Sequence, residues 1–195
     1  MKTDIILAGV GGQGILSIAT AIGVAALKNG LHVKQAETHG MSQRGGAVVS
    51  HMRISDKAIF SDLIPEGKAD LILSIEPMEA LRYLPYLSET GYIVTNTTPF
   101  KNINNYPELE AVLNKLGSLK RVVAIDADGI AEKIGSKLSS NMVMLGAASP
   151  FIESIELSSL EQGIIELFTS KGQKVVDVNL SALRSGKEFA EKTLN

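Results

Sequence analysis

The chain has 195 residues, of which 45% are apolar, and a formal net charge of −2 at pH 7. Acids and bases are interspersed, without a basic run or an acidic tail, so the charge pattern predicts no nucleic-acid partner and no membrane partner. Cysteine is absent, which excludes disulfide bridges, thiolate zinc sites, a cysteine nucleophile and a Cys-ligated iron–sulfur cluster.

The first apolar run, residues 5–8, is too short for the core of a signal peptide. A membrane span needs about 18 or more consecutive apolar residues, and the sequence has no such stretch. The length suits one α/β domain over residues 1–195. We therefore expect a cytoplasmic, single-domain protein.

The first 37 residues have the pattern of a βαβ unit. Residues 5–8 form a short apolar run that is typical of a buried parallel strand. Residues 9–14 form a tight glycine turn, and residues 15–28 have helical apolar spacing that ends at Asn29-Gly30. Residues 31–36 are the second predicted strand.

The next segment departs from this alternation. Residues 37–46 are polar and glycine-rich, which predicts a loop. Residues 47–54 alternate like a strand, with His51 and Arg53 on one face and Met52 on the other. We predict that residues 37–66 make an excursion from the sheet.

Strands and helices alternate through the rest of the chain. Strands are predicted at residues 70–74, 91–95 and 121–125, and helices at residues 77–84, 107–116, 128–134, 141–148, 158–170 and within 175–194. Ser158 and Glu161 have the spacing of a capping box, and Asp128 has the position of a helix cap. The pattern predicts an α/β fold with a mainly parallel open sheet, helices on both faces and a Rossmann-like start.

The glycine turn has the form G-x-G-x-x-G: Gly9-Val10-Gly11-Gly12-Gln13-Gly14. Between a strand and a helix this motif is typical of dinucleotide binding, and Glu37 has the position of the acid that binds the ribose. The turn can equally serve only to pack the strand against the helix. Two features weaken the dinucleotide interpretation: the chain leaves little room for a catalytic domain, and Glu37 runs directly into a second glycine-rich string.

The second string is Glu37-Thr38-His39-Gly40-Met41-Ser42-Gln43-Arg44-Gly45-Gly46. Together the two strings resemble the signature of the gamma domain of 2-oxoacid:ferredoxin oxidoreductases, most closely that of the small (beta) subunits of the indolepyruvate-type members. The apolar helix that starts at Asn141 and the stretch around Asn179 are similar to this family as well. The resemblance covers essentially the whole chain, and the second string is its most specific part.

The resemblance implies an accessory subunit that is inactive alone. In this family the heteromeric enzyme oxidatively decarboxylates arylpyruvates such as indolepyruvate, transfers the acyl group to coenzyme A and passes electrons to ferredoxin. Thiamine diphosphate, magnesium and iron–sulfur clusters would belong to the large alpha partner subunit, and this chain would bind none of them firmly. The sequence agrees with that division, since it has no cysteine and no Gly-Asp-Gly motif for thiamine diphosphate.

Several polar residues are candidates for a shared site. His39 can donate a hydrogen bond or titrate near neutral pH, or it is simply a surface histidine. Arg44 can bind a phosphate or carboxylate, or it forms an ion pair, for example with Glu37, that shapes the loop. Gln13 and Gln43 can contact a ligand or partner, although we favour hydrogen bonds within their own loops. The cofactor-binding or loop-shaping candidates are Gly9, Gly11, Gly12, Gln13, Gly14, Gln43 and Arg44.

His32 and His51 are interpreted as structural, and no pair of histidines has the spacing of metal ligands. Two alternative functions stay open from the residues alone. One is a stand-alone oxidoreductase domain that binds a dinucleotide through residues 9–14 and Glu37. The other is a non-catalytic interaction protein with the same fold.

Overall fold

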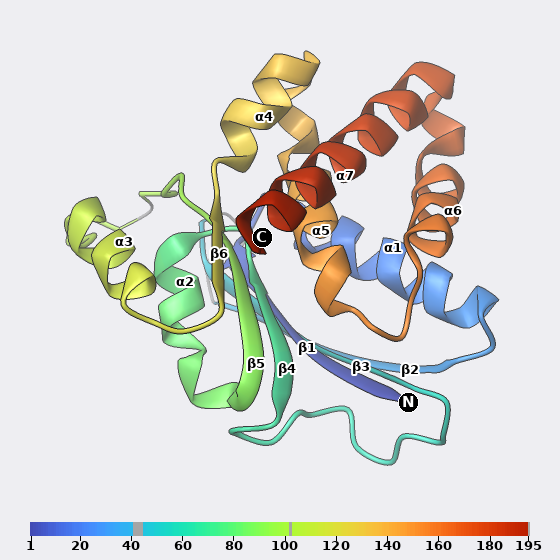
Figure 1. The fold of residues 1–195 in the computed structure, drawn as a ribbon, viewed down its shortest axis with the longest axis horizontal. Helices are drawn as coiled ribbons and strands as arrows, with labels where there is room; N and C mark the ends of the chain where they lie inside the picture. The colour runs from blue at the N-terminus through green and yellow to red at the C-terminus, as the bar shows by residue number, and fades with distance from the viewer. Residues whose placement is uncertain (41–44, 102, 195) are drawn as a thin grey trace.

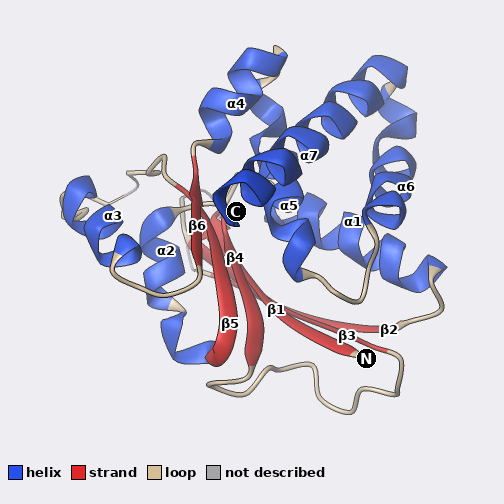
Figure 2. Ribbon diagram, in the orientation of Figure 1, coloured by secondary structure: helices blue, strands red, loops and turns tan. Residues whose placement is uncertain are grey.

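The computed structural model describes residues 1–40, 45–101 and 103–194. A six-stranded sheet with the order β2-β3-β1-β4-β5-β6 forms the middle layer, and helices cover both of its faces (Figures 1 and 2). The strands are β1 (Lys2–Val10), β2 (His32–His39), β3 (Ala47–Ser55), β4 (Ala69–Ser74), β5 (Leu87–Asn96) and β6 (Val122–Ile125). This confirms the predicted fold class.

The helices are α1 (Ile15–Lys28), α2 (Pro77–Arg82), α3 (Leu109–Gly117), α4 (Ala127–Ile134), α5 (Ser140–Ala148), α6 (Leu157–Phe168) and α7 (Gln173–Leu194). In the described part of the chain, no helix combines the length and the apolar character needed to cross a membrane.

Residues 37–66 depart from βαβ alternation as predicted, but β3, which belongs to this segment, lies within the sheet. Strands β1, β4, β5 and β6 pair in parallel, whereas β3 pairs antiparallel with both β1 and β2. The two strands of the predicted βαβ unit therefore run in the same direction without being neighbours. The predicted loop also begins too early, because Glu37, Thr38 and His39 continue β2 and pair with β3.

Residues 56–68 leave the sheet as a long connection (Figure 2). An ion pair between a half-buried arginine and a buried aspartate anchors it: the Arg53 guanidinium donates to the Asp4 carboxylate at 2.9 and 3.1 Å. The same guanidinium donates to the main-chain oxygens of Ser61 and Leu63 at 3.2 and 3.1 Å. The excursion is therefore tied to the sheet at its middle.

Alternation along the central strands divides the core between the two faces of the sheet. Ile5 and Leu7 of β1 face α1 and the α4–α7 group, whereas Ile6 and Ala8 face α2 and α3. β4 repeats the pattern, so both faces of the parallel strands are apolar. The sheet is thereby fixed in register, since a shift of one residue would exchange the two faces.

Helix α5 is the central helix of the larger layer, and every residue from Asn141 to Ala148 is buried, as predicted. It crosses α7 at two glycines that bring the backbones together. A Cβ atom on Gly146 would lie 1.9 Å from the Leu183 main-chain oxygen, and one on Gly186 would lie 1.9 Å from that of Val143. Side chains do not fit at either position.

Two predicted helix caps are wrong. Helix α6 begins at Leu157, so Ser158 lies inside it and forms no capping box; Glu156 is the residue before the helix. At α4 the cap is Asp126, whose Oδ1 accepts from the Gly129 N–H at 2.9 Å. Asp128 lies within that helix, where its carboxylate accepts from Asn96 instead.

The α5–α7 crossing gives a stability prediction. Gly186→Ala should lower the free energy of unfolding by about 3 kcal/mol or more, because the added methyl group must push two backbones apart. Gly117→Ala is the matched control, since nothing lies within 4 Å of a Cβ at this helical position. The control should be neutral or stabilising by up to about 1 kcal/mol. Urea unfolding of both variants is the measurement, and equal free energies would contradict the close crossing.

Candidate functional site

The carboxyl ends of β1, β4, β5 and β6 meet at one edge of the sheet, the usual place for a ligand in an open α/β fold. The glycine turn follows β1 at this edge. Gly12 and Gly14 have φ of 101° and 86°, in the left-handed region that glycine enters at no steric cost. A Cβ on Gly14 would also lie 2.5 Å from the Asn141 Nδ2, so the turn packs directly on the start of α5.

Gln13 closes the glycine turn on itself. Its Oε1 accepts from the Val10 N–H at 2.8 Å, while its own N–H donates to the Val10 main-chain oxygen at 3.1 Å. These hydrogen bonds favour the loop-shaping interpretation of Gln13. Gly9 belongs to the same arrangement, because a Cβ there would lie 3.0 Å from the Gln13 Oε1.

A hydrogen bond joins the two glycine-rich strings. The Gly11 N–H donates to the Gly46 main-chain oxygen at 2.9 Å, and the Gly40 N–H donates to that of Ala47 at 2.8 Å. His39, at the end of β2, is exposed, and its Nε2 forms an ion pair with the Glu37 carboxylate when the ring is protonated. The Gln43 and Arg44 candidates lie outside the described residues.

Glu37 is poorly placed for the ribose of a dinucleotide. In the register of the sheet, Glu37 and Leu7 of β1 are both partners of Ser50 on β3. Glu37 is therefore two strand spacings from β1, about 10 Å, instead of one. Its carboxylate is also engaged by His39 and by the Gln35 amide at 3.3 Å. This geometry weakens the dinucleotide alternative.

Two hollows flank the turn, and Gly12 lines both. One has a volume of about 390 Å³ and is lined by Gly12, Gln13, Ile75, Asn96, Thr98, Pro99, Phe100, Asp128, Glu132, Lys137, Leu138 and Ser140. The other, of about 300 Å³, lies between the turn, the start of α1, His39 and Val48. We call the first the edge cleft. His39 and the glycine turn are thus brought together around the second hollow.

The polar groups of this edge favour binding over covalent chemistry. Helix α1 starts here without a side-chain cap, so its first N–H groups are candidate donors to an anion or carbonyl group. Helix α5 also lacks a side-chain cap, but its first N–H, that of Ser140, donates to the Lys137 main-chain oxygen. The Asn141 Nδ2 donates to the Gly14 main-chain oxygen at 3.3 Å, and its buried Oδ1 has no hydrogen-bond partner among the described residues. Asn96 is satisfied by Asp128, Thr98 and Ala127.

The sequence reasoning missed a buried carboxylate at the same edge. Glu76, between β4 and α2, accepts from the Tyr106 hydroxyl and caps α2. Burial, followed by the hydrogen bond to Glu76, raises the pKa of Tyr106, so the hydroxyl keeps its proton and donates. The position of Glu76 directly before Pro77, at the start of a predicted helix, could have indicated the helix cap. Nothing in the sequence indicated the hydrogen bond between Glu76 and Tyr106.

The other two histidines have no place at this edge. His51 is buried, its Nδ1 accepts from the Ile64 N–H at 3.1 Å, and its ring meets Tyr86 edge-on. Burial lowers the pKa of His51, in keeping with a neutral structural residue. His32 is exposed at the start of β2. Over residues 1–40, 45–101 and 103–194, no three histidine or acidic side chains gather closely enough to hold a metal ion.

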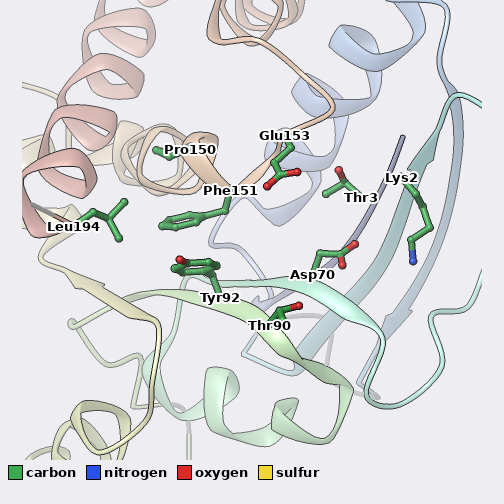
Figure 3. A pocket seen from close by; sticks show the side chains of 9 residues that line it. All are labelled: Lys2, Thr3, Asp70, Thr90, Tyr92, Pro150, Phe151, Glu153 and Leu194. Carbon is green, nitrogen blue, oxygen red and sulfur yellow. The ribbon is translucent and has the colours of Figure 1, made fainter.

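A further cavity of about 460 Å³ lies at the opposite edge of the sheet, near the starts of β1 and β4. Figure 3 shows the Tyr92 and Phe151 rings stacked there, with centroids 4.2 Å apart, beside Asp70 and Glu153. None of the candidate residues from the sequence lines this cavity. We therefore place the candidate site at the carboxyl edge.

Known proteins resemble this chain over nearly its full length. The family model of pyruvate ferredoxin/flavodoxin oxidoreductases matches residues 4–189. The chain is 40% identical to indolepyruvate oxidoreductase subunit IorB of Archaeoglobus fulgidus, over 95% of this chain and 94% of that protein. It is 39% identical to subunit IorB of Pyrococcus horikoshii, over 98% of each chain.

Solved structures share the fold. Pyruvate oxidoreductase subunit PORC from Thermotoga maritima has a TM-score of 0.73 and 27% identity over 96% of each chain. A 2-oxoglutarate:ferredoxin oxidoreductase from Magnetococcus marinus, with 2-oxoglutarate, coenzyme A and succinyl-CoA bound, has a TM-score of 0.77 at 24% identity. That match covers 98% of this chain but 31% of the longer chain, and it shows the fold alone. The resemblance carried by the two glycine-rich strings is confirmed, and the chain belongs to the pyruvate ferredoxin/flavodoxin oxidoreductase family.

Proposed function

We propose that this chain is the small subunit of an indolepyruvate:ferredoxin oxidoreductase. In this proposal a large alpha subunit binds the 2-oxoacid and performs the decarboxylation, and the acyl group passes to coenzyme A while electrons pass to ferredoxin. The chain acts as one gamma-type domain over residues 1–195. The identity of about 40% to indolepyruvate oxidoreductase subunits, over nearly the whole of both chains, supports the choice of substrate.

The observation that carries the proposal is the hydrogen bond between Gly11 and Gly46, which joins the two family strings at the carboxyl edge. This contact brings the glycine turn, His39 and the uncapped start of α1 into one surface. Loops carry function when a rigid scaffold positions them. The segment from Thr38 to Gly46 has little apolar content to bury on its own domain, so we assign it to the shared active site or to the coenzyme A channel.

The cofactors are assigned to the partner. A chain without cysteine cannot ligate an iron–sulfur cluster through thiolates. The sequence also has no Gly-Asp-Gly motif for thiamine diphosphate, and we assign thiamine diphosphate with magnesium to the large subunit. This chain would contribute N–H donors and side chains that orient the bound substrates.

The direct test compares the purified chain with the reconstituted complex. Alone it should show no oxidation of indolepyruvate with any electron acceptor, because it lacks ligands for the redox centres. With its large subunit, the complex should reduce ferredoxin in the presence of indolepyruvate and coenzyme A. Turnover by the single chain, or a large subunit that is fully active without it, would contradict the proposal.

Arg44 tests the role of the second string. Arg44→Ala should lower turnover of the complex by about one to two orders of magnitude, since losing a hydrogen bond to a bound anion costs about 1.5–3 kcal/mol. The melting temperature of the free subunit should stay unchanged. Arg184→Ala is the control, because that exposed arginine on α7 forms only a surface ion pair with Glu161. A destabilised subunit in a fully active complex would instead assign Arg44 to loop shape.

The glycine motif leads to a separate prediction about nucleotides. The isolated chain should bind neither NAD nor FAD, because Glu37 lies two strands from β1 and is paired with His39. Titration calorimetry is the measurement. Micromolar binding of either nucleotide would favour the stand-alone dinucleotide-binding alternative.

A further inference from the structure

Glu76 makes more hydrogen bonds than its place before α2 requires. Its side chain is 0% exposed, and Oε2 accepts from the Glu79 N–H at 2.9 Å, which caps the helix. Its other oxygen, Oε1, accepts from the Phe100 N–H at 3.4 Å and from the Tyr106 hydroxyl. A buried carboxylate is costly unless its lone pairs are satisfied, and here half of them are satisfied from a distant part of the chain.

The second set of bonds reaches the wall of the edge cleft. We call residues 97–101 the edge segment; its Thr98, Pro99 and Phe100 line the same cleft as Gly12 and Gln13. The start of the edge segment is held by the sheet, because the Thr97 N–H donates to the Ile125 main-chain oxygen at 3.0 Å. The Thr98 N–H donates to the Asn96 Oδ1 at 3.3 Å. Glu76 holds the edge segment further along, at Phe100.

Tyr106, further along the chain, completes this anchor. Its hydroxyl donates to the same Oε1 that accepts from the Phe100 N–H, so one oxygen atom joins the two positions. Helix capping alone would need neither contact. If Glu76 and Tyr106 had only a structural role, removing the hydrogen bond between them would lower the stability of the fold but would not change ligand binding in the edge cleft.

We infer that Glu76 and Tyr106 are positioning residues for the reaction, which fix the edge segment so that the cleft beside the glycine turn keeps its shape. The inference rests on the proposed function, since it treats the edge cleft as part of the surface that the subunit contributes to the shared active site. Neither residue touches the reacting atoms in this account. Both act through Phe100 and its neighbours.

Tyr106→Phe is the sharpest test, because it removes one hydroxyl and keeps the ring. In the free subunit, amide hydrogen exchange of the edge segment should speed up about tenfold, while exchange in β1 and α5 stays unchanged. In the reconstituted complex, KM for indolepyruvate or coenzyme A should rise about fivefold to tenfold, with kcat changed less than twofold. Glu76→Gln should act in the same direction on both readouts. Tyr86→Phe should change neither, because Tyr86 lies beyond the end of α2 and packs its ring against His51.

Three results would overturn the inference. Unchanged exchange in the edge segment of both variants would show that Glu76 does not hold it. Faster amide exchange in the edge segment with an unchanged KM would show that Glu76 and Tyr106 have only a structural role. The proposed function would still stand in that case, because the complex would be active. A wild-type complex without any turnover would contradict both the proposed function and this inference. That result would be seen before any variant is made.

Discussion

The antiparallel pairing of β3 between β1 and β2 determines how the candidate site is built. Because β3 runs back beside β1, its first residues return to the carboxyl end of β1, where Val10 pairs with Ala47. Gly46, directly before β3, is thereby placed against the glycine turn, and the Gly11 N–H donates to the Gly46 main-chain oxygen. The same strand moves Glu37 one position outward. In a βαβ unit with adjacent strands, Glu37 would lie beside the glycine turn and Gly46 would not. The insertion of β3 between β1 and β2 is therefore what distinguishes this edge from a dinucleotide-binding site.

In the complex that we propose, this chain contributes shape and hydrogen-bond donors. Helix α1 begins at the turn without a side-chain cap, whereas the neighbouring α4 is closed by Asp126. Uncapped N–H groups and the partial positive charge of a helix start suit an anionic or carbonyl group. The partner would complete these donors at the hollows on both sides of Gly12.

Local signals predicted the parts of the fold that local physics determines. The apolar run of β1, the turn, the spacing of α1 and the all-round apolar character of α5 each follow from a few neighbouring residues, and the structure confirms them. The place of β3 could not be predicted in this way, because its pairing is decided by strands far away in sequence. The capping box at Ser158 failed because Leu157 already continues the apolar stripe of α6, which tertiary packing favours over the cap. Glu76 and Tyr106 are 30 residues apart, and only the packed chain shows that they meet.

The glycine turn is also coupled to the most tightly packed part of the molecule. Asn141 lies in the first turn of α5, and its amide holds the Gly14 main-chain oxygen. Helix α5 in turn is fixed by its contact with α7, where Gly146 and Gly186 leave no space for a side chain. Helix α5 cannot shift at this crossing without pushing two backbones into each other, because protein interiors are close-packed and deform little. The position of the turn is therefore set by helix packing on one face of the sheet, whereas the far wall of the edge cleft depends on Glu76, which caps a helix on the other face. The two walls of the edge cleft thus rest on separate layers, and the sheet between them fixes their distance.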